Sequence, residues 1–119
     1  MTLSDTAHRL WQYLTTNGAY GPEYAITQDR LVERLGIVVP GLDRRRLQRA
    51  RVECIRAGRP VLGRSGINGG YYIPRDWREA RPGLCEMRKR ARTTYAEYDR
   101  ACDACRDYWR VGQARLFAG

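Results

Sequence analysis

A glycine-rich stretch, VLGRSGINGGYYIP (residues 61–74), decides how the chain folds. Its two ends carry β-branched, aliphatic or aromatic side chains, which favour strands. The glycines between them supply the positive φ angles of a hairpin turn. A flexible linker would lack the flanking strand formers, and a phosphate-binding loop would lead straight into a helix, which Pro74 opposes. The stretch therefore predicts a β-hairpin. Tyr71 and Tyr72 are expected on its opposite faces, one in the core and one outside.

Three short helices are predicted ahead of the hairpin, over residues 4–18, 26–37 and 42–58. Each starts after a side chain that caps helix N-termini and stops at a glycine. The capping residues are Ser4, Thr27 and Asp43. The first segment also has apolar residues at the spacing of one helical face, namely Ala7, Leu10, Trp11 and Leu14. This order of elements predicts a mainly α fold with a small β-hairpin, over residues 1–75.

A longer helix is predicted after the hairpin, from about residue 81 to residue 110. Its apolar or small residues alternate at spacings of three and four, which makes a heptad seam of about three and a half repeats. They are Leu84, Met87, Ala91, Thr94, Tyr98, Ala101, Cys105 and Tyr108. Such a seam fits a helix that pairs with its symmetry mate, and it also fits a helix laid back over its own domain. We expect residues 76–119 to form the dimerisation element of a homodimer, with Trp77 anchoring its junction with the hairpin.

Positive charge is concentrated in the segment that holds the third helix and the hairpin. The 119-residue chain carries 22 Lys and Arg against 13 Asp and Glu, for a net charge of +9. Residues 41–75 hold nine arginines against Asp43 and Glu53, for +7. A charge placed in this way is typical of a protein that binds a polyanion. Frequent arginine codons in a high-GC genome explain why arginine replaces lysine, but not why acids are scarce in this segment.

Residues 5–75 resemble the winged helix-turn-helix family of small bacterial and phage DNA-binding proteins, including the biotin-repressor-like type. The motifs that carry the resemblance are an LxxxLG second helix (Leu31 to Gly36), a recognition helix ending in GRPV (residues 58–61), and a wing closing on GYYI (residues 70–73). The family's recognition helix usually has an apolar residue near Arg51 and a leucine near Cys54, and this sequence departs from both. The resemblance implies duplex DNA binding, with the third helix in the major groove and the hairpin beside it.

The third helix separates its apolar residues from its basic ones. With residues 100° apart, Leu47, Ala50 and Cys54 share one face, and a polar face lies opposite. That opposite face carries Arg45, Gln48, Arg49, Val52 and Arg56. Arginine can hold O6 and N7 of guanine, and glutamine can hold N6 and N7 of adenine. We therefore expect the first three of these residues to read bases, with Arg56 also contacting DNA.

Contacts with the DNA backbone are expected on either side of this face. Arg44 and Arg46 flank the start of the helix, where free backbone N–H groups also suit phosphates. In the hairpin, Arg64 and Asn68 are placed to reach a minor groove or a phosphate.

Cys102 and Cys105 form a CxxC pair, which Cys85, Cys54 or His8 could complete as a zinc site. Without a second CxxC or an HxxxH pattern, and with both thiols on the apolar seam, packing as small hydrophobes is favoured. Catalysis has little support, because no nucleophile–base pair, carboxylate pair or nucleotide loop accompanies the single histidine. We expect no enzymatic activity, no cofactor and no metal.

The expected function is that of a sequence-specific binder of double-stranded DNA, acting as a transcriptional regulator. No apolar run approaches the roughly 20 residues of a membrane span, and the N-terminus lacks the residue order of a signal peptide. A cytoplasmic location, in a bacterial cell or a phage-infected host, is therefore expected. Two alternatives remain: an architectural or accessory factor for phage recombination, replication or packaging, and a winged-helix module that binds proteins.

Overall fold

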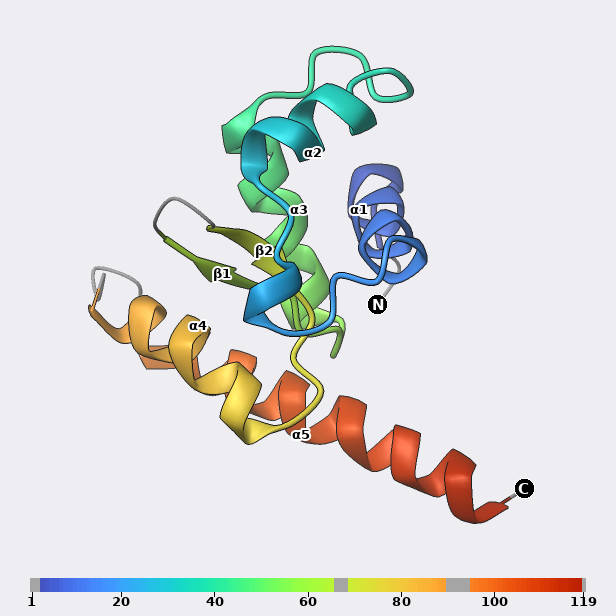
Figure 1. Ribbon diagram of the computed structural model, residues 1–119, viewed down its shortest axis with the longest axis vertical. Coiled ribbons are helices and arrows are strands. Elements are labelled where there is room, and N and C mark those ends of the chain that lie inside the picture. The colour runs from blue at the N-terminus through green and yellow to red at the C-terminus, as the bar shows by residue number, and fades with distance from the viewer. Residues whose placement is uncertain (1–2, 66–68, 90–94, 119) are drawn as a thin grey trace.

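The described part of the chain is mainly helical, and its two strands form one antiparallel hairpin (Figure 1). The computed structural model describes residues 3–65, 69–89 and 95–118. The elements are, in chain order, α1 (Asp5–Thr16), the 3-10 turn η1 (Pro22–Tyr24), α2 (Gln28–Leu35), α3 (Arg44–Arg56), β1 (Leu62–Arg64), β2 (Gly70–Tyr72), α4 (Trp77–Lys89) and α5 (Tyr95–Ala118). The predicted fold class, mainly α with a small β-hairpin, is confirmed.

The first three helices begin at the capping residues predicted from the sequence, which are Ser4, Thr27 and Asp43. In each case the capping side chain accepts a hydrogen bond from the backbone N–H three residues further on. These bonds satisfy one of the donors that a helix start leaves without a partner inside the helix. Local side-chain chemistry therefore sets where α1, α2 and α3 begin.

The hairpin is extended by Ile26, which lies just before α2 and pairs with Tyr71. In register, Leu62 lies opposite Tyr72, and Gly63 lies opposite Tyr71. The backbone N–H of Ile26 donates to the carbonyl of Tyr71 at 2.9 Å, and the N–H of Tyr71 donates back at 2.8 Å. Gly70 has a φ of 152°, and a Cβ there would lie 2.1 Å from the carbonyl oxygen of Ile26. Glycine is therefore required where the loop meets the hairpin.

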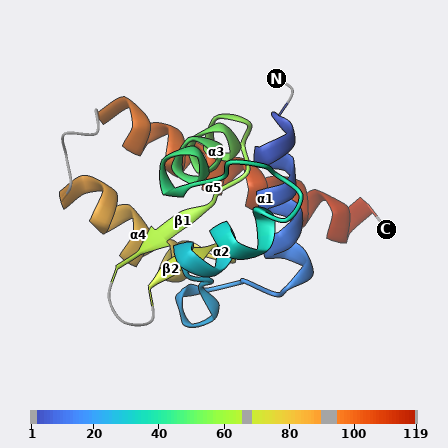
Figure 2. The same cartoon turned by 90° about the horizontal axis from the view of Figure 1, so that it is seen from above.

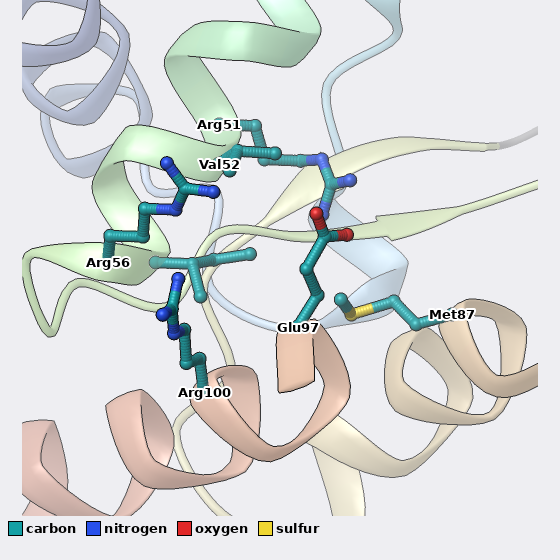
Figure 3. A pocket seen from close by; sticks show the side chains of 7 residues that line it. Arg51, Val52, Arg56, Met87, Glu97 and Arg100 are labelled. Atoms are coloured by element: carbon teal, nitrogen blue, oxygen red, sulfur yellow. The ribbon is translucent and has the colours of Figure 1, made fainter. Parts of the chain in front are cut away.

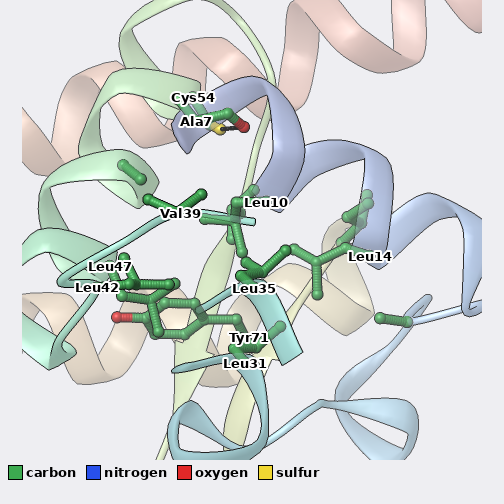
Figure 4. Packing of buried hydrophobic residues seen from close by; sticks show 14 residues of the cluster. Ala7, Leu10, Leu14, Leu31, Leu35, Val39, Leu42, Leu47, Cys54 and Tyr71 are labelled. Carbon is green, nitrogen blue, oxygen red and sulfur yellow. Dashed lines mark hydrogen bonds between the residues drawn. The ribbon is translucent and has the colours of Figure 1, made fainter. Parts of the chain in front are cut away.

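One hydrophobic cluster fills the space between the first three helices and one face of the hairpin (Figure 4). Leu10 and Leu14 of α1 pack with Leu31 of α2 and Leu47 of α3, and Tyr71 closes the cluster from β2. Burying a leucine side chain stabilises the folded state by about 1.5–3 kcal/mol, so the four leucines together contribute several kcal/mol. This cluster therefore holds α3 with its apolar face inward.

The single long helix predicted after the hairpin is two helices, α4 and α5, packed against each other. Figures 1 and 2 show α5 running back alongside α4 and beneath α3. The seam positions Ala91 and Thr94 lie outside the described residues. The start of α4 also differs from the prediction, since it begins at Trp77, where the N–H of Glu79 donates to the Asp76 carboxylate at 2.9 Å.

The second face of the hairpin provides the physical reason for this difference. Leu62 and Tyr72 point away from the first cluster and form a second one with Leu84 of α4 and with Ala101 and Cys105 of α5. An apolar face of this kind must be covered, and α4 and α5 cover it. These seam residues are thus buried within their own chain, as in the fold-back interpretation, and the homodimer through this seam stays a prediction.

The expectation that one of the two adjacent tyrosines lies outside is wrong. Tyr71 is 4% exposed and Tyr72 is fully buried, each in a different cluster. The alternation of faces was correct, but α4 and α5 enclose the face that would otherwise meet solvent. Trp77 lies at the junction as predicted. Its ring meets that of Trp109 edge-on, with 4.7 Å between ring centroids, and Trp109 Nε1 donates to the carbonyl of Pro74 at 3.1 Å.

Across the residues placed by the structure, none of the helices is both long and apolar enough to cross a membrane.

Candidate nucleic-acid interface

The orientation of α3 determines which of its arginines face solvent. Leu47, Ala50 and Cys54 are buried along one side of the helix, as the 100° spacing predicted. Cys54 Sγ donates to the carbonyl of Ala7 at 3.4 Å, which further ties this side to α1. The opposite side is consequently turned outward, and its residues in the first two turns of α3 are exposed.

Arg45, Gln48 and Arg49 occupy this outward side of α3, and all three are exposed. Within the described residues, no side-chain hydrogen bond or ion pair engages any of them. Three long polar side chains on one helical face are therefore free to contact a ligand. Their exposure agrees with the sequence-based prediction, and their role in reading bases stays a prediction.

Arg44 and Arg46 are also exposed, but each has a partner within the protein. Arg44 pairs with the carboxylate of Asp29 on α2, with its Nε at 3.0 Å. Arg46 Nη1 donates to the carbonyl of Pro40, in the loop between α2 and α3, at 2.9 Å. Sequence reasoning did not find these contacts. Because an arginine has five N–H donors and exposed ion pairs contribute little to stability, both side chains can still donate to a phosphate.

The turn end of the hairpin is anchored to α4. Arg64, the last residue of β1, is exposed, and Asn68 lies outside the described residues. Next to Arg64, the hydroxyl of Ser65 donates to Glu86 Oε1 at 2.5 Å, and its backbone N–H donates to the same oxygen at 3.2 Å. Arg64 is thus held at a fixed end of the strand.

The second half of α3 faces α5: Arg56 is exposed, as expected from the sequence, but Val52 does not lie on the open surface. Val52 is half-buried and lines a groove between α3, α4 and α5 (Figure 3). Arg56 reaches the rim of this groove, where α5 contributes Arg100. Arg51 turns inward, with its guanidinium carbon 5.6 Å from the centroid of the Tyr71 ring. Arg100 was not predicted, because nothing in the sequence places the start of α5 beside α3.

Cys102 and Cys105 lie together on α5 at the second cluster, whereas the other candidate ligands lie on other helices. Cys54 is buried in the first cluster and Cys105 in the second, while Cys85 is exposed on α4 and His8 is exposed on α1. Burial raises the pKa of the Cys54 and Cys105 thiols to about 12. Both thiols are therefore protonated at neutral pH. In the part of the chain that the structure describes, no three His, Cys, Asp or Glu residues are grouped as metal ligands would be.

Comparison of the chain with protein-family models, with curated proteins and with solved structures finds no match. The interpretation of the exposed arginines therefore rests on their positions, partners and charge.

Proposed function

We propose that this protein binds double-stranded DNA and reads its sequence with the first two turns of α3. The observation that carries the proposal is the outward face of Arg45, Gln48 and Arg49, on a helix whose other face is fixed in the core. An α-helix fits the major groove, and these side chains have the donors and acceptors that distinguish guanine and adenine there.

The neighbouring arginines support the same proposal. Arg44 and Arg46 surround the start of α3, where they are exposed and suited to phosphates on the rim of the groove. Arg64 adds a positive charge at the hairpin. The order of three helices and a hairpin, with Ile26 bridging to β2, is in keeping with the winged-helix resemblance of residues 5–75.

Regulation of transcription is the role that we assign to this binding. The test is selection from a randomised duplex library at about 150 mM salt, where phosphate contacts alone give weak binding. Enrichment of one motif supports sequence reading, and an inverted repeat would further indicate a homodimer. Retention without an enriched motif would instead favour the architectural or accessory role in phage recombination, replication or packaging. If no duplex is retained, the DNA-binding proposal is wrong.

Substitution of the reading residues localises the interface. Arg45→Ala and Arg49→Ala should each weaken binding to the selected site by roughly 1–3 kcal/mol and relax base preference at one position. Arg110→Ala is the matched control, because Arg110 is also exposed but belongs to the second half of α5 (Tyr95–Ala118). In Figure 1 that half of the helix extends away from the start of α3. Unchanged affinity in both test variants would show that another face reads the DNA.

A further inference from the structure

The groove between α3, α4 and α5 has an apolar floor and a charged rim (Figure 3). Val52 and Ile55 of α3 and Met87 of α4 supply the apolar atoms, and Ile55 is only 5% exposed. The groove measures about 260 Å³ with its open mouth included. Sites for organic cofactors and drug-sized ligands start at about 300 Å³ of enclosed space, so this groove is suited to something smaller.

The charges of the groove do not balance. Arg51, Arg56 and Arg100 line it together with a single carboxylate, that of Glu97. Figure 3 shows this carboxylate pointing toward Arg51, and Arg56 and Arg100 together at the other side of the groove. Among the described residues, no carboxylate lies within ion-pair distance of Arg56 or Arg100. Two guanidinium groups from different helices thus share one opening with no anion of the protein between them.

We infer that this opening binds one phosphate group between Arg56 and Arg100. Two like charges held near each other repel, and a shared anion replaces the repulsion with two attractions. Guanidinium groups hold phosphate oxygens in pairs of parallel hydrogen bonds, which a lysine cannot do. The apolar floor limits water on one side, so that these attractions are less screened than on an open surface.

The source of the phosphate, but not the existence of the site, rests on the proposed function. On α3, Arg56 points within about 20° of Arg45 and Arg49, because residues are 100° apart. It lies 11 residues after Arg45, or about 16 Å along the helix axis. The major groove is about 12 Å wide, so a helix that reads bases with its first turns brings Arg56 to the level of a phosphate backbone. A DNA phosphodiester is therefore the expected occupant, and free inorganic phosphate has the same chemistry.

The test measures duplex affinity between about 50 and 200 mM salt for the wild type, Arg56→Ala, Arg100→Ala and the double variant. Loss of one phosphate contact makes the slope of log K against log salt less negative by about 0.9. The fall in affinity between about 50 and 200 mM salt is then about 3.5-fold smaller for the variant than for the wild type. Because both arginines hold the same phosphate, the double variant should lose little more than either single variant. The effect should be the same for selected and unrelated duplexes. Arg110→Ala, on the same helix as Arg100, is the matched control.

Glu97→Gln should change duplex affinity in the direction opposite to the arginine variants. A variant that merely folds poorly would not bind more tightly. Removing the carboxylate leaves the groove more positive, so this variant should bind duplex DNA more tightly than the wild type. The inference is overturned if the arginine variants match Arg110→Ala in slope and affinity. It is also overturned if the double variant loses two full contacts, or if Glu97→Gln weakens binding.

Failure of the proposed function would be seen separately, as a wild type that binds no duplex. In that case the melting temperature is measured in inorganic phosphate and in chloride at equal ionic strength. A larger rise in phosphate for the wild type than for the double variant supports the site with free phosphate as its occupant. Equal rises for both proteins overturn the inference.

Discussion

The hydroxyl of Tyr72 lies between two backbone groups of α4 that are one helical turn apart. It donates to the carbonyl of Glu79 at 2.6 Å and accepts from the N–H of Gly83 at 3.1 Å. Pro82 stands beside this contact and has no N–H of its own to give to the helix. A side chain inserted between the hydrogen-bonding groups of a helix, like a proline, is a common cause of a bend in the helix. Gly83 makes this insertion possible, since a Cβ there would lie 2.9 Å from the hydroxyl oxygen.

Tyr72→Phe is expected to lower the free energy of unfolding by about 1–3 kcal/mol, because the buried amide of Gly83 loses its partner while the ring still fills its space. Urea unfolding followed by circular dichroism measures the change. Tyr24→Phe is the control, because Tyr24 is exposed and its substitution should change stability by less than about 0.5 kcal/mol. Equal midpoints for both variants would show that the hydroxyl contributes nothing.

The buried thiols lead to a second expectation at the scale of single residues. Since burial raises the pKa of Cys54 and Cys105 to about 12, neither forms appreciable thiolate at pH 7, and neither is accessible. Cys85 is exposed. Iodoacetamide at pH 7, followed by mass spectrometry, should modify Cys85 first and the two buried cysteines only after unfolding in denaturant. Modification of Cys105 in the folded protein as fast as Cys85 would contradict the packing role.

Helix α4 shows how side chains at one terminus define an element. Asp76 caps the helix, and Glu79, three residues later, accepts hydrogen bonds from the backbone N–H of Arg75 at 2.7 Å and from its guanidinium. This is close to the reciprocal capping box, whose sequence signature is visible in Asp76-Trp77-Arg78-Glu79. The signature marks the true start of α4, which the search for apolar periodicity placed at about residue 81.

The ion pair at this terminus gives stability a defined pH dependence. The Arg75 guanidinium holds the pKa of Glu79 below its usual value. A lowered pKa stabilises the folded state fully above the unfolded value of about 4.3, and this stabilisation is lost as the pH falls through the folded value. Glu79→Gln should therefore melt at a lower temperature than the wild type at pH 7, and the two should converge below about pH 4.

Calorimetry from pH 7 down to pH 3 measures this difference. Asp103→Asn is the control, because Asp103 forms an exposed pair with Arg106 whose contribution to stability is small. A difference between Glu79→Gln and the wild type that persisted undiminished at pH 3 would exclude ionisation of Glu79 as its cause.

At the scale of the whole molecule, the hairpin is the layer on which both cores depend. Tyr71 belongs to the cluster with α1, α2 and α3, and Tyr72 belongs to the cluster with α4 and α5. Figure 1 shows α4 and α5 beneath the hairpin, and Tyr108 of α5 also reaches α1, where its ring meets that of Trp11 edge-on with 5.6 Å between ring centroids. Residues 1–75, predicted to be the DNA-binding domain, therefore share their hairpin with the segment that follows.

A chain ending at residue 75 should lose cooperative unfolding or unfold at markedly lower denaturant, because Ile55, Leu62 and Tyr72 would be exposed. Urea unfolding and binding of a dye specific for apolar surface measure this effect. A chain ending at Val111 is the control, since it keeps every residue of the second cluster that the structure describes. A stable, cooperative fragment 1–75 would show that α4 and α5 are a separate unit.

The candidate interface was predictable in part. Exposure of Arg45, Gln48 and Arg49 follows from the helical spacing of Leu47 and its apolar neighbours, which is a local property. The intramolecular partners of Arg44 and Arg46, and the approach of Arg100 to Arg56, depend on how separate elements pack. Contacts between residues distant in sequence leave no periodic signal in a single chain.

By itself the sequence determined the starts of α1, α2 and α3, the hairpin, and the outward face of α3, because caps, turns and helical periodicity act over a few residues. Only the tertiary structure decided what the apolar seam of the last segment contacts. A heptad pattern is satisfied equally by another copy of the chain or by any apolar surface of matching shape. Here Leu62 and Tyr72 supply such a surface within the same chain, and α4 and α5 pack against it.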